Sequence, residues 1–167
     1  MMKLKIRICA LALAALSLCS CGKQERATLN YEQPVSTMTC AAEYSDTRSY
    51  LSCFTPEAKA EYEESEEYNP SLAETLLTRG DDKDGCSLEY KITDKRELDK
   101  SDISELERQY KNSYRKNITV KKAMELNVTF NEKLNGKTLS NTREITVVKI
   151  ENSWLIFGNV ITDFNFT

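Results

Sequence analysis

The sequence predicts an α+β domain in which N-terminal helices pack on an antiparallel sheet. In the first part of the chain beyond residue 35, apolar residues recur three or four positions apart, as on one face of a helix. In the later part, apolar and polar residues alternate, as in strands that bury one face. Because the helices precede the strands and do not alternate with them, the pattern favours an α+β fold over an α/β fold.

The chain begins with a segment that has the organisation of a bacterial signal peptide. Lys3, Lys5 and Arg7 give its start a positive charge, and residues 8–18 are predominantly apolar. This apolar run is shorter than the roughly 20 residues that a membrane-spanning helix needs. We therefore expect a protein that is exported.

The residues before Cys21 resemble the lipobox of bacterial lipoproteins. Leu18-Cys19-Ser20-Cys21 is an aliphatic residue, two small residues and then the cysteine that receives lipid. The resemblance implies a signal peptide at residues 1–20, cleavage before Cys21, and acyl chains such as palmitate that hold the protein at the cell membrane, outside the cytoplasm. An ordinary secretory signal is the alternative.

The rest of the chain divides into a tether and one domain. Residues 21–35 are polar and lack an apolar period, so we interpret them as the lipidated cysteine and a flexible tether. Residues 36–167 are enough for a single domain with one core.

Composition excludes several functions. Without the basic residues of the signal peptide, 26 acidic residues remain against 20 basic ones, and no basic cluster carries interleaved aromatic residues, so nucleic acid is not an expected partner. The chain contains no histidine, which excludes Ser-His-Asp and Cys-His catalysis and any imidazole metal site. Neither a metal nor another cofactor is expected.

Three cysteines follow Cys21, namely Cys40, Cys53 and Cys86. An odd number leaves at least one of them as a thiol. If residues 40–53 formed one helix, the sulfurs of Cys40 and Cys53 would lie about 20 Å apart and could not bridge. A break at Ser45-Asp46 would bring them closer, so buried thiols and a disulfide both stay open.

Helices are expected first along the domain. Thr55-Pro56-Glu57 has the features of a helix start, with Thr55 as N-cap and Pro56 at the first helical position. Before it, Asp46 can cap a short helix. The apolar stripe of this region consists of Cys40, Tyr44, Thr47, Leu51 and Phe54.

Polar residues dominate the next stretch. The acidic run at residues 60–68 is expected to be a solvated helix face, and a further helix is expected from Asn69-Pro70 to Gly80. Residues 81–85 form a predicted turn. They do not fit a calcium-binding EF-hand loop, because Lys91 falls where the bidentate glutamate belongs.

Strands are expected in the second half. Residues 86–92 and 124–130 alternate between apolar and polar, and Asn135-Gly136 predicts a tight hairpin. A return strand at residues 143–150 contains adjacent Val147-Val148, which indicates burial on both faces. Residues 154–157 form the last predicted strand.

One helix is predicted between the strands. Asp102-Ile103-Ser104-Glu105 matches a capping box. Leu106, Tyr110 and Tyr114 then lie on one face of the helix that follows.

Two stretches resemble small bacterial lipoproteins with a nuclear-transport-factor-2-like domain. Residues 45–58 contain the Asp46 and "TPE" helix start of that family, and residues 147–154 resemble its hairpin ending in tryptophan. The resemblance covers roughly residues 36–160. It implies a cone in which a curved antiparallel sheet wraps the N-terminal helices, and the helix at residues 102–115 is an addition to the minimal cone.

The resemblance also raises the possibility of an enzyme. The related ketosteroid isomerase uses a carboxylate base with neutral donors such as tyrosine in an apolar site. Tyr44, Asp46 and Tyr90 are the candidate catalytic residues, with both tyrosines expected on inward faces. Asp46 suits a helix cap equally well, and no convergent reactive set is evident.

Tyr110, Tyr114 and Trp154 are the candidate binding residues, and all three also suit core packing. We therefore expect a non-catalytic envelope lipoprotein that binds a protein, a peptide or a small apolar ligand. A lyase or isomerase of the ketosteroid-isomerase type and a structural or assembly factor are the alternatives.

Overall fold

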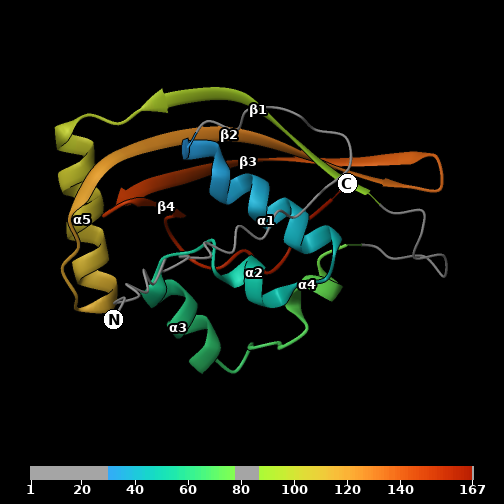
Figure 1. Cartoon of the computed structure of the whole chain (residues 1–167), viewed down its shortest axis with the longest axis horizontal. Helices are drawn as coiled ribbons and strands as arrows, with labels where there is room; N and C mark the ends of the chain where they lie inside the picture. Colours follow the sequence, from blue (N-terminus) through green and yellow to red (C-terminus); the bar gives the residue numbers. More distant parts are fainter. Residues whose placement is uncertain (1–29, 78–86, 167) are drawn as a thin grey trace, which may run out of the picture.

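The structure is a computed structural model, and it describes residues 30–77 and 87–166. These residues form one four-stranded antiparallel sheet with several helices, which confirms the α+β class (Figure 1). In that part of the chain, no helix is long and apolar enough to cross a membrane.

The N-terminal helices are short and closely spaced. They are the 3-10 helix η1 (Asn30–Glu32), α1 (Gln33–Glu43), α2 (Thr47–Leu51), α3 (Pro56–Glu64) and α4 (Leu72–Thr75). Ser45, with φ of 61°, separates α1 from α2. The predicted cap is confirmed, because the Asp46 carboxylate accepts a hydrogen bond from Ser49 N at 3.0 Å.

The helical part begins earlier than the sequence indicates. Pro34 occupies the first turn of α1 and Val35 is fully buried, although both lie in the segment expected to be a tether. The helix expected from Asn69 to Gly80 is observed only as α4, and residues 78–80 lie outside the described part. The predicted turn at residues 81–85 and Cys86 lie outside it as well.

The strands follow one another across the sheet. They are β1 (Ser87–Glu97), β2 (Val120–Leu134), β3 (Lys137–Ile150) and β4 (Ser153–Ile156), in the order β1-β2-β3-β4. The predicted hairpin is confirmed, since Asn135 and Gly136 have φ of 50° and 77° in the turn between β2 and β3.

The sheet arches over α1, α2 and α4 (Figure 1), and the face turned to these helices carries the main core. Phe130 and Val147 are fully buried there. At one end of the sheet α5 (Lys100–Tyr114) covers the opposite face, where Ala123 and Val148 are also fully buried. The prediction that Val147-Val148 is buried on both faces is therefore confirmed.

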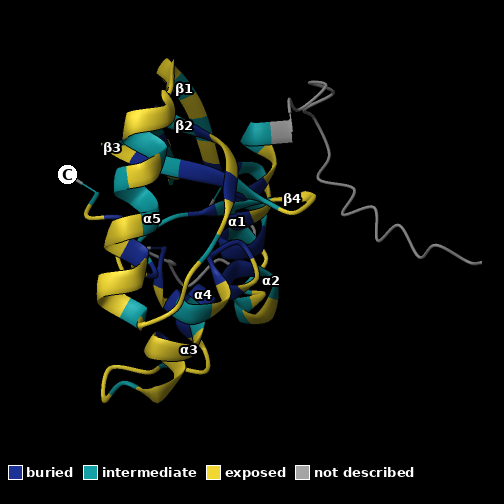
Figure 2. Ribbon diagram, turned by 90° about the vertical axis from the view of Figure 1, so that its left-hand side faces the viewer, coloured by how far each residue is buried: buried dark blue, intermediate teal, exposed yellow. Residues whose placement is uncertain are grey.

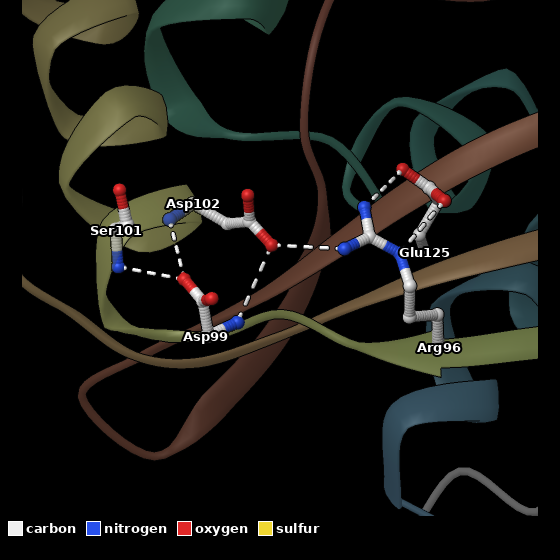
Figure 3. Close-up of polar contacts among 5 residues, drawn as sticks. All are labelled: Arg96, Asp99, Ser101, Asp102 and Glu125. Carbon is white, nitrogen blue, oxygen red and sulfur yellow. Dashed lines mark hydrogen bonds and ion pairs between the residues drawn. The ribbon is translucent and has the colours of Figure 1, made fainter.

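The start of α5 differs from the prediction (Figure 3). Asp99, and not Asp102, is the N-cap, and its carboxylate accepts from Ser101 N and Asp102 N at 2.7 and 2.9 Å. The Asp102 carboxylate accepts in return from Asp99 N at 3.4 Å and also pairs with Arg96 of β1 at 2.9 Å. Arg96 pairs with Glu125 of β2 as well. A capping box is therefore present, but it starts at Asp99 and not at the predicted Asp102, because a carboxylate three residues earlier caps equally well and the helix begins shortly after β1 ends.

The acidic run is solvated, as expected, but the helix predicted over residues 60–68 is wrong beyond residue 64. Helix α3 ends at Glu64, and its outer side is exposed (Figure 2). Only Ala58 and Tyr62 of α3 are buried. The acidic side chains therefore lie in water, and Tyr62 anchors the helix to the core.

Candidate functional site

The space between the sheet and the helices is filled by the chain's own C-terminal residues. Phe164 is fully buried, and its ring centroid lies 4.8 Å from that of Phe130 on β2. Val160 is buried in the same core, with Ile161 packed against it. The helix face of the sheet is thus occupied by side chains where a pocket could have been.

Polar side chains hold this C-terminal segment in place. Tyr50 Oη donates to the carbonyl of Ile161 at 2.8 Å, and Asn141 Nδ2 donates to the carbonyl of Phe164 at 2.5 Å. Arg143 donates to another carbonyl of the segment. Burial raises the pKa of Tyr50, which keeps its hydroxyl protonated as a donor. Side-chain donors therefore satisfy main-chain carbonyls of this segment, which in a strand would be paired with a neighbouring strand.

An open groove of about 380 Å³ lies beside β4, at the turn between β3 and β4. A groove of this volume is within the range of small-ligand sites. None of its lining side chains is charged. Its walls are Gln33, Pro34 and Thr37 of α1, Ser52 and Cys53 after α2, and residues 152–155.

Trp154 is the largest side chain of the groove, and its position has two causes. A two-residue turn, in which Glu151 has φ of 52°, starts β4 opposite the end of β3 and pairs Trp154 with Lys149. The Tyr31 ring meets the indole edge to face with centroids 6.2 Å apart. Lys95 Nζ in turn donates to Tyr31 Oη at 2.8 Å, so the aromatic pair is fixed from η1 and β1.

The thiol of Cys53, which lines the groove, is unreactive. This thiol is buried and lies 3.4 Å from the carbonyl oxygen of Ser49, and burial raises its pKa to about 12. A thiol with such a pKa is protonated at neutral pH and is a poor nucleophile. Cys40 is also a thiol, so no disulfide joins Cys40 to Cys53.

A second polar cluster ties α3 to α5. Glu57, in the first turn of α3, accepts a hydrogen bond from the Tyr110 hydroxyl and pairs with Lys116 Nζ at 3.1 Å. The Tyr110 hydroxyl, followed by Lys116, holds the pKa of Glu57 below its usual value. Burial, followed by the hydrogen bond to Glu57, raises the pKa of Tyr110. The neutral phenol and the ionised carboxylate therefore stabilise each other.

The structure does not bring the three candidate catalytic residues into one interior site. Tyr44 is 62% exposed, so its predicted inward orientation is wrong. The reason is that α1 ends at Glu43 and Tyr44, as its C-cap, no longer follows the helical period. Asp46 is exposed and serves as a cap, while Tyr90 is half-buried against the main core.

The three candidate binding residues separate into two places. Tyr110 and Tyr114 pack together at the Glu57 cluster, with centroids 4.7 Å apart. Trp154 alone lines the groove.

The sequence analysis missed Gln33, Thr37 and Glu57 as site residues. Gln33 lay in the supposed tether, although Pro34 beside it is a helix-start signal that could have revealed the wall. Glu57 was predicted only as part of the helix start Thr55-Pro56-Glu57. Its partner Tyr110 lies 53 positions away, and no local pattern points to that contact.

In residues 30–77 and 87–166, no group of three or more acidic, cysteine or histidine side chains could hold a metal ion.

No protein-family model, curated protein or solved structure matches the chain. The candidate site is therefore defined by its geometry, which is an uncharged groove with one tryptophan at the edge of a sheet.

Proposed function

We propose that the protein is a lipid-anchored, non-catalytic binding protein of the cell envelope, and that the groove beside Trp154 is its binding site. The observation that carries this proposal is the contrast between the two spaces. The helix face is filled by Phe164 and its neighbours, whereas the groove is open and lined by hydroxyl, amide and aromatic groups. Groups of these kinds orient an uncharged ligand without chemistry.

The anchor places this groove near a membrane. In the proposal, the signal peptide at residues 1–20 is removed and lipid on Cys21 holds the protein. Residues 22–29 then link the anchor to η1, and eight extended residues span at most about 30 Å. Because Gln33 and Pro34 line the groove, a ligand of the groove must be available close to the membrane surface.

We also propose that the domain is a variant of the nuclear-transport-factor-2-like cone. The order of short helices followed by an antiparallel meander supports this assignment. The arch of the sheet over the N-terminal helices supports it as well (Figure 1). In this variant α5 is an addition, and the C-terminal segment occupies the space that holds a ligand in the enzymes of the family.

The isomerase alternative has less support. It requires a carboxylate with a raised pKa in an enclosed apolar cavity. Glu57 and Tyr110 are a carboxylate and a tyrosine in contact, but the pKa of Glu57 is lowered and Lys116 pairs with it. This pair has the properties of a structural contact between α3 and α5.

The anchor is tested by metabolic labelling with a palmitate analogue in a bacterium that processes lipoproteins. We expect the wild-type chain and Cys19→Ala to be labelled and to fractionate with membranes. Cys21→Ala should lose the label and leave the membrane fraction. A label that remains on Cys21→Ala and disappears from Cys19→Ala would overturn the assignment.

The groove is tested by fluorescence, because Trp154 is the single tryptophan of the chain. The full chain in detergent is titrated with uncharged peptides and, separately, with uncharged oligosaccharides. We expect one class to shift the emission maximum and to protect the indole from quenching by acrylamide. No change with either class would remove the groove as the binding site, whatever the labelling shows.

A further inference from the structure

The outer edge of β4 has a hydrogen-bonding pattern that identifies the chemistry of the ligand. Ile156 uses its main chain in a parallel bridge to Phe54. Its N–H donates to the carbonyl of Cys53 at 2.7 Å, and its carbonyl accepts from Thr55 N at 3.2 Å. Both groups of Ile156 therefore point away from β3.

Strand alternation gives the same direction to Trp154. In an antiparallel pair, a residue whose N–H and C=O point outward is followed two positions away by another of the same kind. Phe157 N donates to the carbonyl of Thr146 on β3 at 2.8 Å, so the main chain of Phe157 points toward β3 and that of Ile156, one position earlier, points away. The main-chain N–H and C=O of Trp154 thus point away from β3, toward the groove that Trp154 lines.

These two groups are available. Within residues 30–77 and 87–166, no hydrogen bond is formed by the outward N–H or C=O of Trp154. The chain segment that pairs with Ile156 turns away at Ser52 and Cys53, which become the wall of the groove. An unpaired donor and acceptor at the edge of a sheet form a template for another extended chain.

We propose that the groove binds a short, extended, uncharged peptide segment, which pairs with the main chain of Trp154 and continues the bridge that Phe54 makes with Ile156. This inference rests on the proposed binding function and names its ligand class. The absence of charged side chains from the lining selects an uncharged segment, because a charge placed there would lose hydration without gaining a partner. The Cys53–Ile156 contact closes one end, so the segment extends over Trp154 and leaves the groove past Asn152.

The side chains of the groove then have distinct roles. The indole of Trp154, held by Tyr31, forms the apolar wall against which side chains of the segment pack. Thr37, Ser52 and Gln33 offer hydroxyl and amide groups to the segment's main chain. Main-chain pairing supplies affinity with little sequence preference, and the walls supply the selection against charge.

The test uses three bead libraries of acetylated hexapeptides and the full chain in detergent, labelled with a fluorophore. The first library contains only uncharged residues, the second is the same library N-methylated at alternate residues, and the third carries Asp or Lys at alternate positions. N-methylation removes main-chain donors and leaves the side chains unchanged. We expect the first library to retain at least about threefold more protein than the second, as the loss of the one hydrogen bond to the Trp154 C=O predicts. It should also retain more than the third, whose charges find no partner in the groove.

Two variants at Trp154 separate the main chain from the indole. Trp154→Ala keeps the outward N–H, so binding should weaken while the preference for the first library over the second persists. Trp154→Pro removes the N–H without removing a hydrogen bond of the β3–β4 ladder, since this N–H points away from β3. It keeps the C=O that accepts from the peptide N–H, so its preference for the first library over the second should persist. Its binding of the first library should fall below that of Trp154→Ala, because the hydrogen bond from the residue 154 N–H is lost.

The comparison of the first two libraries needs no variant, so it decides the matter even if Trp154→Pro does not fold. Equal retention by the first and second libraries would overturn main-chain pairing. If no library is retained but an uncharged oligosaccharide shifts the Trp154 fluorescence, the peptide inference fails and the proposed binding function stands. If neither kind of ligand acts, both fail.

Discussion

The two ends of β4 differ in how completely the fold closes them. At the C-terminal end, the main chain of Ile156 is paired with residues 53–55, and the Phe157 ring lies 6.0 Å from that of Tyr110. At the N-terminal end, Trp154 is half-buried and lines an open groove. One short strand therefore has a closed end at Ile156 and an open end at Trp154.

The two ends of β4 also differ in whether their polar groups have partners. At the closed end Tyr110, Glu57 and Lys116 satisfy one another. At the open end the outward groups of Trp154 face an uncharged groove and have no such partners among the described residues. Changes at the closed end should therefore alter stability, and changes at the open end should alter binding.

The largest expected effect on stability is at Ile156. Replacement by Ala removes a fully packed side chain from the core and should lower the free energy of unfolding by about 2–5 kcal/mol. Urea denaturation followed by circular dichroism measures it. The neighbouring Leu155→Ala is the matched control, because Leu155 is only half-buried and should cost less. An equal loss of stability in both variants would contradict the conclusion that Ile156 is packed in the core and Leu155 is not.

Tyr110→Phe should have the next largest effect. It keeps the buried ring but removes the donor to Glu57, and a hydrogen bond to a charged group contributes about 1.5–3 kcal/mol. The same denaturation experiment measures the change. Tyr114→Phe serves as the control, since its ring packs on Tyr110 while its hydroxyl makes no hydrogen bond within the described residues. A loss in Tyr114→Phe as large as in Tyr110→Phe would show that the hydroxyl contact to Glu57 is not specific.

The closed end should also be weakened by acid. The pKa of Glu57 is lower in the folded chain than in the unfolded chain, so its stabilising contribution is fully present above about pH 5 and is lost as the pH falls through the folded pKa. Denaturation midpoints between pH 7 and 2 should decline less steeply in Glu57→Gln than in the wild type. Tyr110→Phe should flatten the profile in the same direction, because the Tyr110 hydroxyl is the first cause of the shift. An unchanged slope in both variants would contradict this account.

The smallest effect on stability is expected at Tyr31, which supports the open end. Tyr31→Phe keeps the edge-to-face contact with Trp154 and loses only the hydrogen bond from Lys95. We expect its fluorescence anisotropy to match that of the wild type, whereas Tyr31→Ala should free the indole and lower the anisotropy. Matching anisotropy in all three proteins would show that Tyr31 does not fix Trp154.

Much of the fold could be predicted because its signals are local. The Asp46 cap and the Asn135-Gly136 turn depend on the backbone geometry of a few adjacent residues, and both are confirmed. The two adjacent valines also predicted burial on both faces of the sheet, and Val147 and Val148 are both fully buried. The start of α5 could not be predicted in the same way, because Asp99 and Asp102 have the same capping chemistry.

The candidate site could be predicted only in part. Trp154 was a candidate from its place at a strand end, and it lines the groove. The opposite wall comes from Gln33 and Thr37, which no local pattern relates to a strand more than a hundred residues away. Tyr44 was misplaced because the helical period was continued one residue beyond the end of α1.

The sequence by itself determined the class of the fold, the order of helices and strands, the Asn135-Gly136 turn and the Asp46 cap, since each depends on neighbouring residues. Only the tertiary structure decided that Phe164 fills the interior, that Glu57 meets Tyr110, and that Trp154 borders a groove. These contacts join segments distant along the chain, and they depend on how the helices, the sheet and the C-terminal residues share one limited core volume.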